Sequence, residues 1–160
     1  MRKTSGLALI TFLAGAGSAA AAQPSQIKVQ AESVADLCVP AADRDRPMSD
    51  YSDAERIAMI SCAQRQSARQ VNAQLPNQID EITVLERITA DGARLTYHSR
   101  LALAATRITA AQRAALIEGT RNFVCSNDDM LQTMSYGGSY GYVWIDPDDV
   151  EIARTVIEGC

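Results

Sequence analysis

Apolar side chains, with one glutamine, recur every three or four residues after Ser52, a spacing typical of a helix with one buried face. The recurring positions are Ile57, Ile60, Gln64, Ala68, Val71 and Leu75. Ser52 and Glu55 have the spacing of a capping box, in which the two side chains satisfy free N–H groups of the first turn. Pro76 cannot continue a helix because it lacks a backbone N–H group. The pattern therefore predicts a long helix between Ser52 and Pro76.

A second helix is predicted after Thr109, where Thr109 and Gln112 repeat the capping-box spacing. Its buried positions are expected to be Leu116, Thr120, Phe123 and Val124. This helix extends to Cys125, and the polar run 126–129 then begins a short third helix. Gly137 ends the third helix, because glycine is a weak helix former.

Alternation of apolar and polar residues predicts two β-hairpins. The first joins residues 82–89 to 95–103 through Asp91-Gly92, a pair that tolerates positive φ. The two faces of its first strand are expected to carry Ile82, Val84 and Ile88 against Thr83, Leu85 and Arg87. Its return strand is expected to direct Leu95, Tyr97, Leu101 and Leu103 inward, and Arg94, Thr96, His98 and Arg100 outward. The second hairpin joins residues 139–145 to 150–157.

The predicted order of elements is α-β-β-α-α-β-β, which indicates an α+β fold. Two hairpins with short connections give a four-stranded antiparallel sheet, and helices of this length are expected to cover one of its faces. Residues 52–160 then form one domain. Residues 23–51 contain Pro24, Pro40 and Pro47 and little apolar periodicity, so we expect an extended N-terminal arm.

The first 22 residues have the features of a signal peptide. Arg2 and Lys3 precede an apolar run, and small residues end at Ala22, a pattern that suits signal-peptidase cleavage. The apolar run is shorter than a membrane-spanning helix requires. Removal of these 22 of the 160 residues leaves 138, and the mature chain is expected in the periplasm or outside the cell.

Charge narrows the classes of partner. Of the 15 basic residues, Arg2 and Lys3 lie in the leader, so 13 remain against 19 acidic residues, a formal net charge of −6. A domain of this charge repels phosphate backbones, so nucleic-acid binding is not expected.

The four cysteines, Cys38, Cys62, Cys125 and Cys160, all lie in the mature chain. An even number in an exported protein indicates two disulfides, with three possible pairings. Cys62 falls off the buried face of its helix, so a partner from the arm suits it and we favour Cys38–Cys62 with Cys125–Cys160. The absence of a C-x-x-C motif excludes a thioredoxin-type redox centre and disfavours a zinc site.

The sequence contains few residues suited to catalysis. His98 is the single histidine, it is expected on an outward strand face, and no G-x-S-x-G motif accompanies it. The acidic turn 146–149 lacks the ligand spacing of a calcium loop, and Asp80-Glu81 could supply only half of a glycosidase carboxylate pair. We therefore predict no catalytic residue, no metal site, no cofactor and no enzyme.

Aromatic residues gather near the C-terminus, at Tyr136, Tyr140, Tyr142 and Trp144. The last three occupy alternate positions and project from one sheet face. In one interpretation these rings form part of the core and Val143 and Ile145 face outward, which is favoured because large aromatic side chains are usually buried. In the other, the rings are an exposed patch for a partner.

Residues 71–160 resemble a functionally unassigned group of small exported bacterial proteins. The similarity consists of Asn72-Ala73-Gln74-Leu75-Pro76, Asp80-Glu81, Leu95-Thr96-Tyr97, Cys125-Ser126, a Gly-x-x-Tyr-x-Tyr-like strand within 137–142, and the terminal Cys160. Where that group has a glycine-containing turn before the last strand, this chain has Asp146-Pro147-Asp148-Asp149. The resemblance implies an exported α+β protein and assigns no functional residue.

These observations favour a non-catalytic periplasmic protein that binds another protein of the cell envelope, such as an envelope accessory factor, an inhibitor or an immunity-type protein. The alternative is binding of a small ligand or glycan through Tyr136, Tyr140, Tyr142 and Trp144. A small hydrolase comes third.

Overall fold

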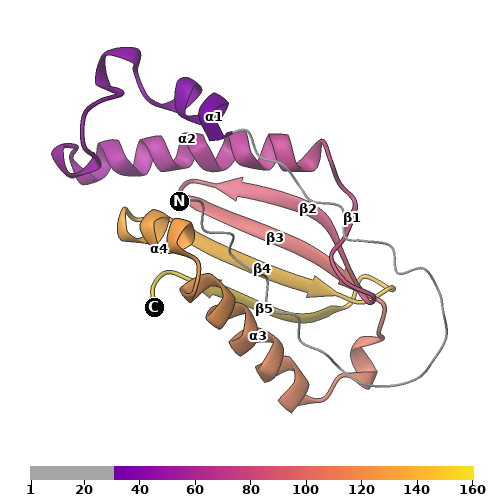
Figure 1. Ribbon diagram of the computed structural model, residues 1–160. Helices are drawn as coiled ribbons and strands as arrows, with labels where there is room; N and C mark the ends of the chain where they lie inside the picture. The colour runs from indigo at the N-terminus through magenta and orange to yellow at the C-terminus, as the bar shows by residue number, and fades with distance from the viewer. Residues whose placement is uncertain (1–30) are drawn as a thin grey trace, which may run out of the picture.

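The computed structural model describes residues 31–160, so the predicted leader and the first residues of the arm lie outside the described part. The α-helices are α1 (Ala31–Cys38), α2 (Asp53–Asn72), α3 (Ala110–Cys125) and α4 (Asp128–Ser135). The strands are β1 (Asn77–Gln78), β2 (Thr83–Asp91), β3 (Arg94–Leu101), β4 (Ser139–Ile145) and β5 (Glu151–Ile157). Short 3-10 turns occupy Ala41–Asp43, Met48–Asp50 and Ala105–Arg107. Figure 1 shows this arrangement.

The sheet is mixed and has five strands in the order β1-β2-β3-β4-β5. Both predicted hairpins are confirmed, as the antiparallel pairs β2–β3 and β4–β5. The prediction of four antiparallel strands is wrong, because β3 and β4 are parallel and β1 adds a fifth strand. The connection from β3 through α3 and α4 returns the chain to the end of the sheet where β3 begins, and such a crossover makes the next strand parallel.

The N-terminal arm is not extended where the structure describes it. It contains α1 and two 3-10 turns, and a disulfide from Cys38 to Cys62 ties α1 to the outer side of α2. Pro40 and Pro47 lie directly before the two 3-10 turns, whereas residues 31–38 contain no proline or glycine that would prevent a helix. The second disulfide joins Cys125 to Cys160, so both favoured pairings are confirmed.

Both long helices begin as the sequence predicts. The Ser52 N–H group donates to the Glu55 carboxylate at 2.8 Å, and the Glu55 N–H group donates back to the Ser52 hydroxyl at 3.4 Å. Thr109 and Gln112 repeat this exchange at 2.9 and 3.2 Å. Each box satisfies N–H groups that a helix start otherwise leaves free.

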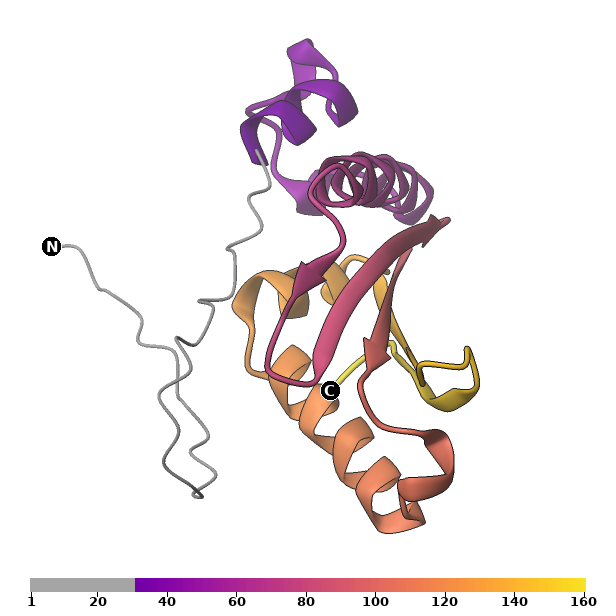
Figure 2. The same cartoon turned by 90° about the vertical axis from the view of Figure 1, so that its right-hand side faces the viewer.

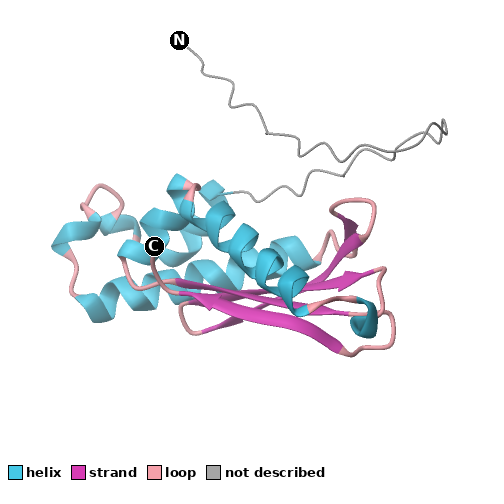
Figure 3. Cartoon of the chain, turned by 90° about the horizontal axis from the view of Figure 1, so that it is seen from below, coloured by secondary structure: helices cyan, strands magenta, loops and turns pink. Residues whose placement is uncertain are grey.

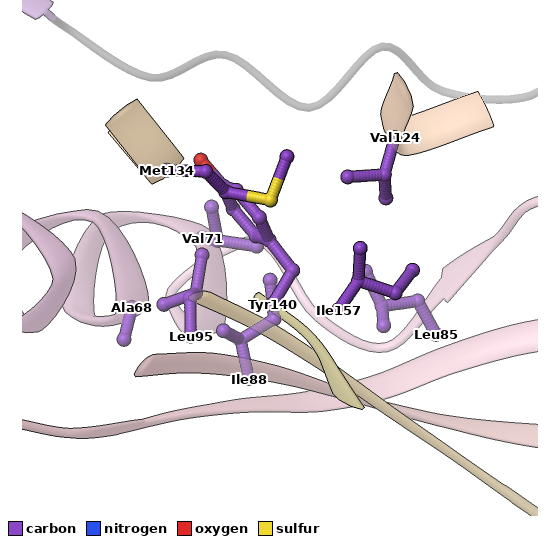
Figure 4. Packing of buried hydrophobic residues seen from close by; sticks show 9 residues of the cluster. All are labelled: Ala68, Val71, Leu85, Ile88, Leu95, Val124, Met134, Tyr140 and Ile157. Carbon is purple, nitrogen blue, oxygen red and sulfur yellow. The ribbon is translucent and has the colours of Figure 1, made fainter. Parts of the chain in front are cut away.

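The α-helices gather on one side of the sheet, and among residues 31–160 no helix covers the other side (Figure 3). α2 packs on β2 and β3, whereas α3 packs on β5. The two helices therefore cover the same face of the sheet near its two opposite edges (Figure 2). The larger buried cluster consists of Ala68, Val71, Leu85, Ile88, Leu95, Val124, Met134, Tyr140 and Ile157 (Figure 4). A smaller cluster consists of Leu101, Ala105, Trp144, Ile152 and Ala153.

A bulge in β2 changes the expected faces of this strand. Leu85 pairs with Ser99 and Arg87 pairs with His98, so Glu86 is an extra residue in the ladder. The extra residue brings Leu85 and Ile88 onto the same buried face, although strict alternation predicts opposite faces.

The edge of β2 beyond β1 is protected by a side chain. The Asn72 amide donates to the Ile88 carbonyl at 2.7 Å and accepts from the Ile88 N–H group at 2.8 Å. This pair of hydrogen bonds replaces the contacts that a neighbouring strand would make, and it blocks edge-to-edge pairing at this position.

Within residues 31–160, no helix combines the length and the apolar character that crossing a lipid bilayer requires.

Candidate functional site

The aromatic residues of β4 belong to the core. Tyr140 and Trp144 are 6% and 5% exposed, beneath the helices. Tyr142 stacks between Tyr97 and Trp144, with ring centroids 5.0 and 5.8 Å apart. Tyr136 lies half-buried at the end of α4. The interpretation as an exposed aromatic patch is therefore wrong for Tyr140 and Trp144, because the crossover helices cover the face to which alternate residues of β4 point.

A groove opens between α2, α4 and the covered face of the sheet. Its volume is about 400 Å³. It is lined by Ile60, Ala63, Gln64, Ser67, Val71, Leu85, Ile88, Leu95, Tyr97, Met130, Thr133 and Tyr140. Most of these side chains are apolar, and those of the floor, such as Leu85, Ile88 and Leu95, are buried members of the larger core cluster, so the groove is a recess directly above the core.

The groove continues along α2 toward α1. A second hollow of about 440 Å³ shares Ile60, Ala63, Ser67 and Thr133 with the first. It adds Val34, Cys38, Val39, Met48, Met59 and Asp129. The small residues Ala63 and Ser67 lie one helical turn apart on α2, where larger side chains would close both hollows.

The polar groups of the groove floor are held in place. The Tyr140 hydroxyl forms side-chain hydrogen bonds with Thr133 and Gln64. Burial raises the pKa of Tyr140, and these two bonds act in the opposite direction. The hydroxyl therefore stays protonated at neutral pH, and the floor presents no charge of its own.

The opposite face of the sheet is polar and uncovered. At one end of this face, Arg100 connects the charged groups. It donates hydrogen bonds to Glu86 at 2.5 Å, to Asp149 at 2.7 Å and to the Asp146 carbonyl at 2.6 Å. Hydrogen bonds with Glu86 and Asp149 raise the pKa of Arg100. Arg154 pairs with Glu151 at 3.0 Å on β5.

His98 faces this open side, as the strand pattern predicts. Its Nε2 atom lies 3.0 Å from the Thr89 hydroxyl. Burial lowers the pKa of His98 first, and the nearby guanidinium groups of Arg87 and Arg154 lower it further. The neutral imidazole has a threonine as its hydrogen-bond partner, and that contact does not assemble a catalytic triad.

The acidic turn after β4 is a structural element rather than a fully solvated loop. Asp146 is 3% exposed, and its carboxylate accepts hydrogen bonds from the N–H groups of Ala105 at 2.9 Å, Asp148 at 2.9 Å and Val150 at 2.8 Å. These bonds, that from Ala105 first, hold the pKa of Asp146 below its ordinary value. Within residues 31–160, no group of His, Cys, Asp and Glu side chains is arranged to hold a metal ion.

Asp146→Asn is expected to flatten the acid dependence of stability. A carboxyl group whose pKa is lower in the folded state stabilises the fold above its unfolded pKa of about 4, and this contribution is lost as the pH falls through the folded pKa. We expect the variant to be less stable than the wild type at pH 7 and to lose less stability between pH 4 and pH 2.

Urea unfolding at several pH values measures this difference in stability. Asp148→Asn, in the exposed part of the same turn, is the control and should keep the wild-type profile; parallel profiles for Asp146→Asn and wild type would contradict the assignment.

Sequence patterns place the strands and caps, but they do not reveal the groove. The lining residues Ala63, Ser67, Met130 and Thr133 carry no catalytic or binding motif. The available signal is the pair of small residues one turn apart on α2, beside the predicted buried stripe. That signal becomes informative only when α4 is known to lie opposite.

No protein-family model and no curated protein sequence matches the chain. Solved structures with a similar fold include a protein of Pseudomonas aeruginosa assigned as secreted, with a TM-score of 0.56 and 18% identity, over 64% of this chain and 91% of that one. The pilotin EpsS of the Vibrio vulnificus type 2 secretion system has a TM-score of 0.56 and 14% identity, over 65% and 92%. The type II secretion pilotin AspS of Vibrio cholerae has a TM-score of 0.53 and 16% identity, over 65% and 93%. At these identities the likeness concerns the fold.

Proposed function

We propose that the mature chain is a non-catalytic accessory protein of the bacterial cell envelope, and that it binds a segment of another protein in the groove between α2 and α4. The observation that carries this proposal is the apolar groove over the covered face of the sheet. Apolar side chains of a partner would leave water there, which is favourable by about 25 cal/mol for each Å² buried.

Two disulfides tie elements around the groove, and one of them includes Cys38, which lines the second hollow. The Cys38–Cys62 bridge fixes α1 to α2, and the Cys125–Cys160 bridge fixes the end of α3 to the C-terminus. A preformed groove loses little conformational entropy when a partner binds. Two bridges in so small a domain also suit an oxidising compartment, which supports a location in the periplasm or outside the cell.

The pilotin fold supports the same class of function by analogy. EpsS and AspS are pilotins of type 2 secretion systems, and we propose a comparable accessory role here. Glycan binding by stacking on the aromatic row has less support, because Tyr140 and Trp144 lie beneath the helices. A hydrolase has less support still, since His98 contacts a threonine rather than a catalytic partner.

Ser67→Trp tests the groove as a binding site. Ser67 lines both hollows, so an indole at this position would fill the space that a partner segment needs. We expect the tagged mature variant to capture at least tenfold less of a protein that the wild type captures from native envelope extract. Quantitative mass spectrometry of the eluates measures the ratio, and thermal unfolding verifies that the variant folds.

Arg65→Trp is the matched control. Arg65 is exposed on α2 and does not line either hollow, so the same indole there leaves the groove open. We expect capture by this variant to equal that of the wild type. Equal capture by Ser67→Trp, or no protein captured by the wild type, would contradict the proposed function.

A further inference from the structure

One row across the open face of the sheet carries three basic side chains and no acidic one. The strand registers pair Arg87 with His98, His98 with Val143, and Val143 with Arg154, so these four residues form a line across β2, β3, β4 and β5. Neighbouring strands lie about 4.8 Å apart, so the row spans about 14 Å. Both guanidinium groups act on the imidazole between them, because each lowers the pKa of His98.

The groups at the two ends of the row are available to a ligand. Arg87 is exposed, and no hydrogen bond or ion pair joins it to another residue within 31–160. Arg154 pairs with Glu151, but the two side chains are 68% and 42% exposed. The pair is bidentate, through Nε and a terminal nitrogen of Arg154, but it is exposed to solvent, so an incoming anion competes with the Glu151 carboxylate for Arg154.

The rows on either side shape a hollow around His98. Toward the Asp91-Gly92 turn lie Thr89, Thr96 and Gly141, which are uncharged. A Cβ atom at Gly141 would lie 2.5 Å from the Thr96 hydroxyl, closer than such atoms normally approach. Because glycine has no side chain, this part of the hollow stays unfilled. The hollow is lined by Glu86, Arg87, Thr89, Asp91, Arg94, Thr96, His98, Arg100, Val143, Ile145, Asp149, Glu151 and Arg154.

Within residues 31–160, three of the four acidic side chains that line the hollow are paired with arginines, and the partner of Glu151 is Arg154 of the row itself. Arg100 pairs with Glu86 and Asp149, and Arg94 pairs with Glu158 at 3.2 Å at the hairpin end. Asp91 lies two rows away from His98. Among the described residues, Arg87 therefore keeps an unpaired positive charge, and Arg154 becomes available when an anion displaces Glu151. The guanidinium groups at the two ends of the row attract an anion that lies between them.

We propose that Arg87, His98 and Arg154 form a binding site for a tetrahedral oxyanion of the phosphate class, on the sheet face opposite the groove. The guanidinium groups would donate paired hydrogen bonds to the oxyanion from both ends of the row, a geometry that arginine suits better than lysine. The imidazole would take up a proton as the anion binds and donate a third hydrogen bond. Affinity should therefore rise as the pH falls. Free phosphate and a phosphate ester on a lipid headgroup share this chemistry.

The single histidine makes the site directly observable, because its imidazole resonances in NMR need no assignment. We expect inorganic phosphate at pH 7 and constant ionic strength to shift these resonances saturably, and chloride to leave them in place. Arg87→Gln and Arg154→Gln should each weaken binding at least fivefold. Arg65→Gln, on the exposed side of α2, is the matched control and should bind as the wild type does. Inorganic sulfate, which keeps its charge between pH 7.5 and pH 5.5, should bind more tightly at the lower pH.

Two further arms separate the sources of the anion. Vesicles of phosphatidylcholine with phosphatidic acid should retain the wild type more than the Arg87→Gln variant if a lipid headgroup is the ligand. Phosphate binding without vesicle binding indicates a soluble phosphate group, which also supports the site. The absence of a saturable shift with phosphate, or wild-type affinity in both arginine variants, would overturn the proposal. The outcome is independent of the groove, because Ser67→Trp should leave phosphate binding unchanged.

Discussion

Trp144→Ala is expected to lower the free energy of unfolding by about 3–5 kcal/mol, the range for removing a buried tryptophan. Trp144 is 5% exposed and packs with Leu101, Ala105, Ile152 and Ala153 in the smaller core cluster. Its ring also stacks on Tyr142, and this contact would be lost. Urea unfolding followed by circular dichroism measures the difference without relying on tryptophan fluorescence.

Val143→Ala is the matched control for this prediction. Val143 is the preceding residue on β4, but it faces the open side of the sheet and is half-buried. We expect a loss of about 1 kcal/mol or less, as for most surface substitutions. Comparable losses in the two variants, or a loss below about 1 kcal/mol for Trp144→Ala, would show that the helices do not cover this face of β4.

The double variant Cys125→Ser with Cys160→Ser is expected to lose about 3–4 kcal/mol of stability. The bridge closes a chain segment with a sequence separation of 35, and loop-closure entropy for this length lies in that range. Ile157, three residues before Cys160, is 1% exposed in the larger core cluster, so the bridge anchors a strand end that the core requires. Thermal and urea unfolding of the variant and the wild type measure the loss.

The other bridge provides the comparison. Cys38→Ser with Cys62→Ser releases α1, which packs on α2 outside both core clusters. Without this bridge, α1 gains freedom in the folded state as well as in the unfolded state. The entropy gained by the unfolded chain is then partly matched in the folded protein, so the free energy of unfolding changes less. We expect the core to lose about 1 kcal/mol or less. A larger loss than for the Cys125 and Cys160 variant would contradict this account of the two bridges.

Local signals in the sequence predict the parts of this fold that local physics determines. The capping boxes at Ser52 and Thr109 begin α2 and α3 because the cap and its partner lie three residues apart. Both hairpins follow from alternation and a short turn. The disulfide pairing follows from one helical projection, since Cys62 lies off the buried face and requires a partner on the outer side of α2.

The errors concern features that depend on distant segments. The parallel pairing of β3 with β4 depends on where α3 and α4 return the chain, which no local pattern encodes. The bulge at Glu86 breaks the alternation by one residue, so strict alternation wrongly separates Leu85 from Ile88. β1 has two residues, too few for any periodic signal. The aromatic row was correctly located on one face, but which face the helices cover depends on the crossover.

The candidate site was harder to predict than the fold, because its lining is chemically plain. Ala63 and Ser67 become functional candidates only because α4 lies opposite them and a recess remains between the two helices. The open face differs in this respect, since its basic residues appear in the outward strand pattern of Arg94, His98 and Arg100. The sequence places those residues on one face but does not bring Arg87 and Arg154 to either side of His98.

The central claim is that a protein partner occupies the groove, and site-specific photocrosslinking in cells tests it most directly. A photoreactive amino acid with a compact diazirine group would replace Met130, which lines the groove, or Gln132, which is exposed on the same helix and does not line it. We predict that irradiation joins the chain to a protein of defined mass from position 130 and to none from position 132. No adduct at position 130, or equal adducts at both positions, would contradict the claim.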